Sequence, residues 1–299
     1  MNSDSEHENA PHDVAAGKGD RRNSTIPRDA KQNRTYCESA HVRRHGVPNG
    51  LRYQIAATMT DREAAFRLVY RVYRQCGLQQ VNADQIRVLP QHLLSTTQVF
   101  VGKAGDEVVS TVTLVVDDAR HGVPMEAVYQ RPIAQRRALK IRFGEVCCFA
   151  DRSRRFRNFL RQPCELTRLM AQYARSQGVE QLLVAVHPRH ARFYTRMMGF
   201  EPIGPVTSYP GARHQPAIAL CLDFERIDQH PPPCYRRYFA EKIPVDELVP
   251  QAMTAVERSY FARMIDVAAI ADGHFDVRQG EPAKWRPDLW RLPPDAAAG

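Results

Sequence analysis

The feature that most constrains the fold is an apolar run followed directly by a short basic segment that ends at a glycine. Residues 182–186 are all aliphatic, and residues 187–198 carry basic and aromatic side chains before Gly199. Short aliphatic runs are typical of buried strands, and a glycine after a periodic segment is a common helix stop. We therefore expect a strand over 181–186 and a helix over 189–198. Tyr194 would stand on that helix beside the strand, where a phenol can donate a proton to a leaving group.

The rest of the chain alternates between strand and helix patterns. Apolar side chains at steps of three and four indicate a helix that ends near Gly77, with its start signal at 60–63. β-Branched residues on both sides of Gly105 predict a hairpin of 98–101 and 108–116. Further strands are expected over 53–57, 142–150, 200–206 and 217–224, and further helices over 133–139, 164–177 and 250–267. This order predicts an α/β fold with a mixed central sheet flanked by helices.

Composition divides the chain into three parts. Residues 1–50 are polar and lack apolar periodicity, so we expect a disordered tail. Residues 51–226 carry the predicted sheet, and residues 227–299 form a C-terminal extension with one helix and a proline-rich tail. The longest aliphatic or cysteine run, 217–222, is far too short to span a bilayer, and no apolar signal core is visible. We therefore expect a cytoplasmic protein without a transmembrane segment.

The net charge indicates which partners the chain favours, and the cysteine content indicates which structural sites it lacks. The formal net charge of +9 favours polyanions, although arginine supplies 36 of the 42 basic residues, a bias that genome composition can produce. The seven cysteines show no C-x-x-C spacing, which argues against a disulfide framework or a thiolate zinc site. The placement of arginine is more informative than its number, because residues 151–161 contain five arginines and no glycine.

Several short segments together resemble one known family. They are 98–101 (QVFV), 110–117 (STVTLVVD), 122–125 (GVPM), 143–146 (FGEV), 187–190 (HPRH) with Phe193-Tyr194, and 216–218 (PAI). They are similar to the N-acyl amino acid synthases, GNAT-fold acyltransferases related to acyl-homoserine-lactone autoinducer synthases. The resemblance covers roughly residues 53–225 and implies that 51–226 form a GNAT-like N-acyltransferase domain.

The resemblance also implies a reaction. A long-chain fatty acyl group would pass from a thioester on acyl carrier protein to the α-amine of an amino acid. The acyl-phosphopantetheine of the carrier protein would be a co-substrate, with no bound cofactor and no metal. Contact with membranes would be peripheral and would arise through the lipid product.

The arginine-rich segment fits this donor. Many GNAT enzymes hold the pyrophosphate of coenzyme A on a glycine-rich loop at a helix N-terminus, and this chain has no such loop at the matching place. Arginines suit a single phosphodiester and an acidic protein surface. We expect the carrier-protein docking surface to consist of Arg152, Arg154, Arg155, Arg157 and Arg161. A solvated loop is the alternative; nucleic-acid binding is disfavoured because the segment offers only two aromatic rings.

Two residues are candidates for proton transfer. Glu145 lies in an otherwise apolar strand, where desolvation would raise its pKa and suit it as a general base; the alternative is an ion pair with Arg142 or Arg168. Autoinducer synthases resemble this strand, but their E-x-x-R-type pattern has an arginine where this chain has Cys148. Tyr194 matches the GNAT general acid, against the alternative of a core phenol bonded to the backbone.

Other residues are candidates for substrate binding. Arg189, with His187 and His190, would bind the amino acid carboxylate; no third ligand with suitable spacing favours a metal. Asp117 would either hold the substrate ammonium or cap a turn. Backbone amides near Val146, Cys147 and Phe149 would polarise the thioester carbonyl.

The two adjacent cysteines can each be interpreted in two ways, and so can the residues expected to line an apolar channel for the fatty acyl chain. Cys147 and Cys148 would either carry an acyl group or be inert buried thiols. The channel residues could equally be core residues: Phe66, Tyr70, Phe100, Leu114 and Phe149. The functional alternatives are a coenzyme A-dependent N-acetyltransferase, an autoinducer synthase using S-adenosylmethionine, and an inactive scaffold that binds nucleic acid or protein.

Overall fold

The computed structural model describes residues 50–118, 121–152 and 163–265. The expected disordered tail, four of the five docking arginines (Arg154, Arg155, Arg157 and Arg161) and the proline-rich tail lie outside the described residues. Within them, no helix is both long and apolar enough to cross a bilayer.

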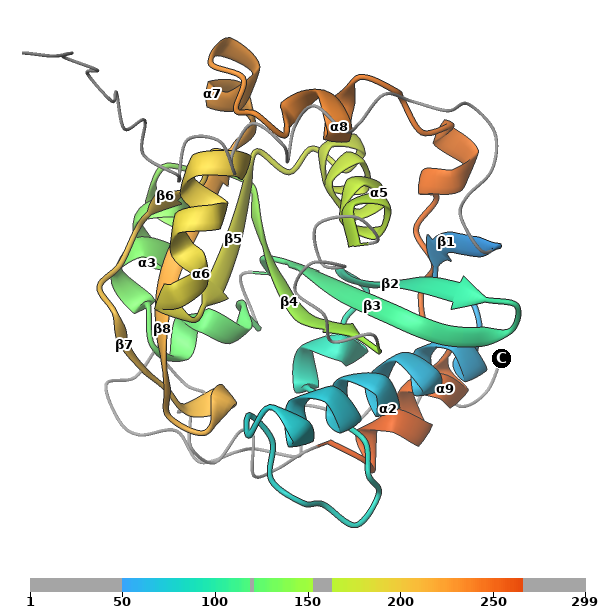
Figure 1. Ribbon diagram of the computed structural model, residues 1–299. Coiled ribbons are helices and arrows are strands. Elements are labelled where there is room, and N and C mark those ends of the chain that lie inside the picture. Colours follow the sequence, from blue (N-terminus) through green and yellow to red (C-terminus); the bar gives the residue numbers. More distant parts are fainter. Residues whose placement is uncertain (1–49, 119–120, 153–162, 266–299) are drawn as a thin grey trace, which may run out of the picture. The chain divides into compact units, whose positions relative to one another are not determined.

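The described strands form one mixed sheet in the order β1-β2-β3-β4-β5-β8-β6, with β7 paired to β8 (Figure 1). Neighbouring strands are antiparallel except β4 and β5, which are parallel. Their bounds are β1 Leu51–Ile55, β2 Thr97–Ala104, β3 Glu107–Val116, β4 Phe143–Asp151, β5 Gln181–Val186, β6 Glu201–Pro202, β7 Thr207–Tyr209 and β8 Gln215–Asp223. The predicted mixed α/β fold is confirmed.

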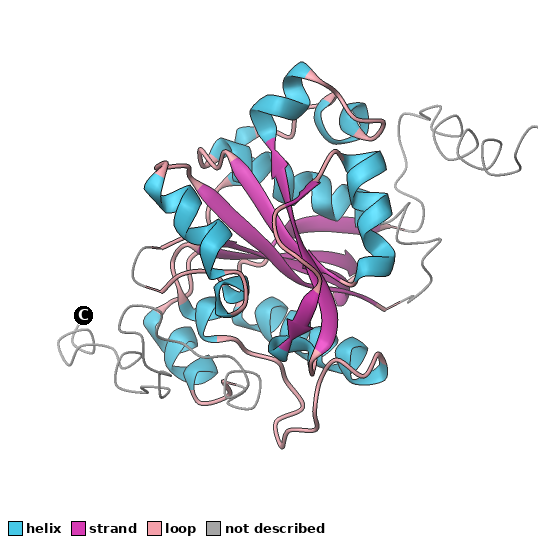
Figure 2. Cartoon of the chain, turned by 90° about the vertical axis from the view of Figure 1, so that its left-hand side faces the viewer, coloured by secondary structure: helices cyan, strands magenta, loops and turns pink. Residues whose placement is uncertain are grey.

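Helices cover both faces of this sheet (Figure 2). One face packs against α5, α7 and α8, and the other against α2 and α9 at one end and α3 at the other. Their bounds are α2 Met59–Gln75, α3 Gln130–Ala138, α5 Pro163–Ser176, α6 Pro188–Phe193, α7 Phe224–Gln229, α8 Tyr235–Phe239 and α9 Ala255–Ala262. We call the two sides the α5 face and the α2 face.

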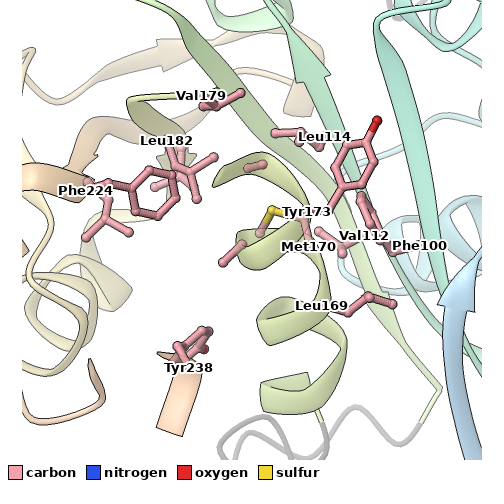
Figure 3. Packing of buried hydrophobic residues seen from close by; sticks show 14 of the residues in the cluster. Phe100, Val112, Leu114, Leu169, Met170, Tyr173, Val179, Leu182, Phe224 and Tyr238 are labelled. Carbon is pink, nitrogen blue, oxygen red and sulfur yellow. The ribbon is translucent and has the colours of Figure 1, made fainter. Parts of the chain in front are cut away.

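The α5 face holds the largest cluster of buried apolar residues (Figure 3). Leu166, Leu169, Met170 and Tyr173 recur at steps of three and four along α5, so the helix turns one stripe toward the strands. The Tyr173 ring meets Phe100 of β2 edge to face at 5.4 Å between centroids. Burying each such side chain contributes about 1.5–3 kcal/mol, which explains why the predicted helix over 164–177 forms.

Residues after 226 pack into the same clusters as the preceding ones. Ile227, Tyr238 and Leu248 join the cluster on the α5 face. The α9 helix packs against α2, where the rings of Phe66 and Phe261 meet edge to face at 5.2 Å. Within residues 227–265, the expected C-terminal extension is therefore part of the hydrophobic core.

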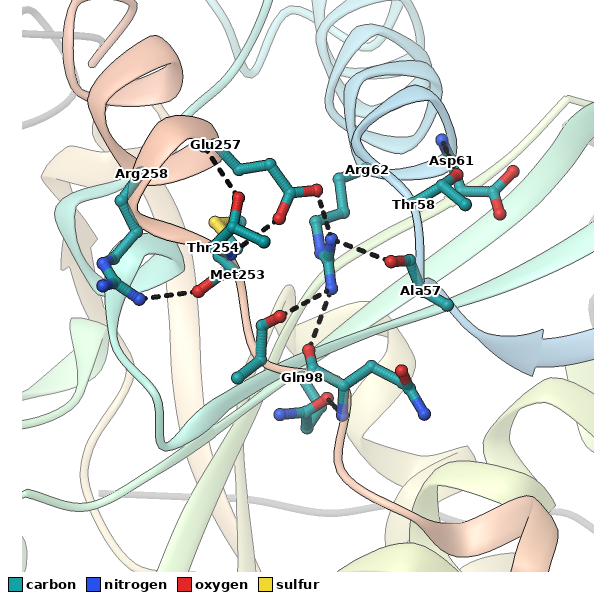
Figure 4. Close-up of polar contacts among 11 residues, drawn as sticks. Ala57, Thr58, Asp61, Arg62, Gln98, Met253, Thr254, Glu257 and Arg258 are labelled. Carbon is teal, nitrogen blue, oxygen red and sulfur yellow. Dashed lines mark hydrogen bonds and ion pairs between the residues drawn. The ribbon is translucent and has the colours of Figure 1, made fainter. Parts of the chain in front are cut away.

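A buried ion pair also joins α2 to α9 (Figure 4). Arg62 donates to Glu257 at 2.6 Å and to the carbonyl of Gln251 at 2.9 Å, with both charged side chains at most 10% exposed. Thr254 and Glu257 form a capping box that starts α9 at Ala255, five residues later than the predicted start at 250.

Three local predictions are corrected. The cap of α2 is Thr58, whose hydroxyl accepts from the amide of Asp61 at 3.1 Å, rather than the signal at 60–63. The helix expected over 189–198 is an α-helix only as far as Phe193, and a π turn follows it from Tyr194 to Met198. Gly199, with a φ of 81°, ends this turn. The strand expected over 200–206 shrinks to Glu201–Pro202, since proline has no amide to donate to a ladder.

Candidate active site

The two parallel strands at the centre of the sheet separate. β4 pairs with β5 only from Phe143 to Glu145, and beyond this point each strand keeps only its other neighbour. Figure 1 shows the two strands diverging toward their carboxyl ends. The separation leaves backbone amides of β4 without a partner strand on the β5 side, in the segment 146–149. Such amides can polarise a carbonyl oxygen.

A β-bulge adds to this irregularity. The register of β3 against β4 shifts between Thr111 and Thr113, opposite Cys148, which has a φ of 50°. A non-glycine residue in this region is uncommon and bends the strand. The bulge therefore turns the backbone of β4 where β5 has already departed.

Two cavities of the described structure meet at the separation. One, of about 190 Å³, lies on the α2 face; its lining includes Arg87, Gln91, Glu145, His187, Tyr209 and Gln215. Most of its lining surface is apolar, and we call it the polar cavity after these charged and polar side chains. The other, of about 150 Å³, lies on the α5 face; its lining includes Phe149, Ala171, Val184, Tyr194, Phe200 and Tyr238. We call it the apolar cavity. Both touch Tyr73, Val146, Cys147, Cys148 and Ala185, so only a thin part of the sheet divides them.

Glu145 lies on the polar side of this junction. It is 2% exposed and its Oε2 accepts from the amide of Met125 at 2.6 Å. Burial raises the pKa of Glu145 to about 8, against the opposing effect of that hydrogen bond. No described residue forms an ion pair with it; Arg168 pairs instead with Glu165. Glu145 is therefore a buried carboxyl with a backbone hydrogen bond, and among the described residues it has no ion pair.

Tyr194 lies on the apolar side, at the start of the π turn. Its ring packs edge to face against Phe200 at 5.3 Å. Burial raises the pKa of the phenol to about 12, and none of the described residues forms a hydrogen bond with its hydroxyl. The phenol thus keeps its proton at neutral pH and has it free to donate, in contrast to a core phenol bonded to the backbone.

The basic segment after β5 only partly reaches a cavity. His187 caps α6 by accepting from the amide of Arg189 at 3.2 Å and lines the polar cavity. Arg189 donates to the His190 ring at 3.0 Å, and neither residue lines either cavity. Burial first, and then Arg189, lower the pKa of His190. Among the described residues, no group of three His, Cys, Asp or Glu side chains could hold a metal ion.

Two other candidate residues, Asp117 and Arg152, form ion pairs outside the two cavities. The Asp117 carboxylate accepts two hydrogen bonds from Arg137, at 2.7 and 2.9 Å, and lines neither cavity. Arg152, the described member of the arginine-rich segment, is exposed at the end of β4 and pairs with Glu107. Asp117 therefore acts in this structure as the partner of an arginine.

The expected acyl-channel residues separate into two groups. Phe149 lines the apolar cavity, as do Val146 and Cys147. The other four expected residues line neither cavity and are buried in the core: Phe66, Tyr70, Phe100 and Leu114. For these four, packing is the role that the structure shows.

The cysteine pair lies at the junction itself. The Cys147 side chain lowers the pKa of the Cys148 thiol, helped by His92 and Arg87 nearby. The same pairing, together with burial, raises the pKa of Cys147. Cys147 and Cys148 are both free thiols, so neither of them forms a disulfide in this part of the sheet.

Sequence reasoning missed several lining residues of the polar cavity. Arg87 follows α2 in a loop, Gln91 lies in a short 3₁₀ helix, and Tyr209 ends β7. The available signal was a single arginine inside the apolar stretch 86–89, where its neighbours are buried. A lone charge in such a stretch needs a partner, which is a reason to examine it.

Comparison with known proteins gives a family and a fold for this chain. A family model described as N-acyl amino acid synthase FeeM matches residues 64–223. The chain is similar to the structure of FeeM, an N-acyl amino acid synthase from uncultured soil microbes, with 24% identity, a TM-score of 0.50, and 58% of this chain and 91% of that chain covered. This similarity shows the fold.

Two further structures are more distant. The AHL synthase LasI has 12% identity and a TM-score of 0.45, covering 59% of this chain and 91% of its own. A putative N-acetyltransferase from Lactobacillus plantarum has 15% identity and a TM-score of 0.41, covering 58% and 99%. No curated protein sequence matches the chain significantly.

Proposed function

The chain belongs to the N-acyl amino acid synthase family and is an N-acyltransferase, and from this we propose that it joins a long-chain fatty acyl group to the α-amine of an amino acid. The proposed donor is a thioester on cytoplasmic acyl carrier protein. The observation that carries the proposal is the meeting of an apolar and a polar cavity where β4 leaves β5, with Glu145 beside the junction.

The two cavities suit the two halves of the product. A fatty chain gains about 0.8 kcal/mol per methylene buried, which favours the apolar cavity for the acyl group. An amino acid carries charges that need polar partners, which favours the polar cavity. The thioester carbonyl would then lie at the separation, where amides of β4 can polarise it.

The proposed chemistry uses one proton acceptor and one donor. Ionised Glu145 takes a proton from the α-ammonium, directly or through water, and the free amine attacks the thioester carbon. A carbon–nitrogen bond forms, the carbon–sulfur bond breaks, and the departing thiolate takes the proton of Tyr194. The second proton that the nitrogen loses on becoming an amide passes through water to the Tyr194 phenolate. Glu145 then releases its proton to solvent, so each turnover releases one proton. Neither cysteine is needed for this direct transfer.

The decisive assay combines the purified protein with C8 to C16 acyl carrier proteins and each of the twenty amino acids, with products identified by mass. An N-acyl amino acid from at least one pair is expected, and no product from any pair would refute the proposal. A parallel series with acetyl-coenzyme A and acyl-coenzyme A tests the donor. Preference for acetyl-coenzyme A would indicate an ordinary N-acetyltransferase instead.

Tyr194→Phe is expected to lower kcat about 10- to 100-fold while the KM for the amino acid changes little, because it removes a proton donor and leaves the ring in place. Steady-state kinetics with a saturating acyl donor measure kcat and the KM for the amino acid separately. Phe193→Leu, which alters the neighbouring ring that also lines the apolar cavity, is the packing comparison. Equal kcat for wild type and Tyr194→Phe would remove Tyr194 from the mechanism.

Ala171→Leu is expected to shorten the acyl chain that the enzyme prefers. Ala171 is buried on α5 and lines the apolar cavity, so a larger side chain there occupies space proposed for the chain end. The ratio of kcat/KM for C16 to that for C8 should fall about 10-fold or more, since each methylene excluded from a pocket costs about 1 kcal/mol or more. An unchanged ratio would place the acyl chain elsewhere.

A further inference from the structure

The polar cavity contains an arginine whose charge no described carboxylate neutralises. Arg87 is 5% exposed, and it appears in none of the ion pairs among the described residues. A buried guanidinium without a counter-charge is costly and marks a place where an anion would be favourable.

Neutral groups hold this guanidinium in a defined orientation. One terminal nitrogen donates to the side-chain oxygen of Gln79, and the other donates to the carbonyl of Gly211 at 2.7 Å. The plane lies over the ring of Tyr73, with 5.3 Å from Cζ to the ring centroid. These contacts fix the side chain, and none of the three groups carries a negative charge.

Two buried donor nitrogens on the lining residues have no hydrogen-bond partner among the residues that the structure describes. They are Nε of Arg87 and Nε2 of Gln91, a residue only 1% exposed. A native structure rarely leaves such groups unsatisfied, and each of the two nitrogens is a donor that needs a hydrogen-bond acceptor. A carboxylate is such a group and also supplies the missing negative charge.

The opposite charge lines the same cavity. Glu145 and Arg87 both line it, and Tyr209 lies within electrostatic range of each: burial raises the pKa of Tyr209 most, Glu145 raises it further, and Arg87 opposes this. The cavity therefore offers an anion-binding group and a proton-accepting group to one small molecule. An α-amino acid has this charge pattern.

We infer that Arg87, assisted by Gln91, binds the α-carboxylate of the acceptor and so restricts the enzyme to amino acids over other primary amines. The inference rests on the proposed function, because it names the group that selects the acceptor in that reaction. It assigns to Arg87 the role that the sequence pattern suggested for Arg189, which lines neither cavity.

The test compares acids with their uncharged amides. For wild type, Arg87→Gln and Arg189→Gln, kcat/KM is measured for amino acids and for the corresponding amino acid amides with one acyl carrier protein. Wild type should prefer the acid, and Arg87→Gln should reduce this preference about 10- to 100-fold, as expected for loss of a charged hydrogen bond. Loss of the preference in Arg189→Gln instead, or an equal fall for acid and amide in Arg87→Gln, would overturn the inference.

A binding measurement separates this outcome from failure of the proposed function. Calorimetry with N-decanoyl amino acids and N-decanoyl amino acid amides needs no turnover. Arg87→Gln should weaken the binding of the N-decanoyl amino acids and leave the binding of their amides and of decanoyl-phosphopantetheine unchanged. Weaker binding of decanoyl-phosphopantetheine would show instead that Arg87 binds the phosphate of the donor. Arg87→Lys, which keeps the charge, should retain part of the acid preference, and it supplies the test if Arg87→Gln does not fold.

Discussion

Glu145→Gln is expected to lower kcat/KM about 100- to 10,000-fold, the usual contribution of a general base. The amide has nearly the same shape and can still accept from the amide of Met125, which now donates to Glu145 at 2.6 Å. The loss should therefore come from proton transfer and not from rearrangement of β4. Activity within a few-fold of wild type would exclude Glu145 as the base.

The pH dependence tests the same residue. Because the pKa of Glu145 is raised to about 8, its basic form accumulates only as the pH rises toward that value. Wild-type kcat/KM should fall about tenfold per pH unit below pH 8, and this dependence on Glu145 should be absent from the residual activity of Glu145→Gln.

Unfolding provides a readout without substrate. The folded state binds the Glu145 proton more tightly than the unfolded chain, so this group stabilises the fold at low pH, and that stability is lost as the pH rises from about 4.5 to about 8. The free energy of unfolding of wild type should therefore fall relative to that of Glu145→Gln over this range. Parallel curves for the two proteins would show that the pKa of Glu145 is not raised.

Glu257→Ala is expected to reduce the free energy of unfolding by about 3–5 kcal/mol, the second large effect. It leaves the Arg62 guanidinium, 2% exposed, without its counter-charge, and it removes half of the capping box of α9. Urea denaturation followed by circular dichroism measures the loss.

An exposed pair is the matched comparison. The side chains of Glu107 and Arg152 are each more than half exposed, so Glu107→Ala should cost less than about 1 kcal/mol. If Glu257→Ala costs no more than Glu107→Ala, the pair between α2 and α9 does not stabilise the fold. Other contacts between these helices would then hold them together, among them the rings of Phe66 and Phe261 and the hydrogen bond from Tyr260 to Glu63.

Local patterns predicted most of the elements that build the sheet. The hairpin around Gly105 and the strand over 181–186 follow from periodicity and turn chemistry, which act between residues close in sequence. The predictions were poorest at 200–206, where prolines limit the ladder, and at 250–267, where the cap at Thr254 sets the helix start.

The candidate site was predictable in part for the same reason. A lone carboxyl in an apolar strand predicted that Glu145 would be buried with a raised pKa, and both features are present. Arginine and histidine at 187–190 suggested a carboxylate site by composition alone. The orientation of α6 decides that only His187 of that group lines a cavity.

By itself, the sequence determined the order of strands and helices and the presence of an acid in an apolar strand, because neighbouring side chains impose those patterns. Tertiary structure alone decided that Arg87, Gln91 and Tyr209 share a cavity with Glu145. Arg87 and Gln91 lie more than 50 positions before Glu145 in the chain, and Tyr209 lies more than 60 positions after it. Their meeting depends on strand order, on the separation of β4 from β5, and on how side chains pack across the sheet, none of which is encoded in local periodicity.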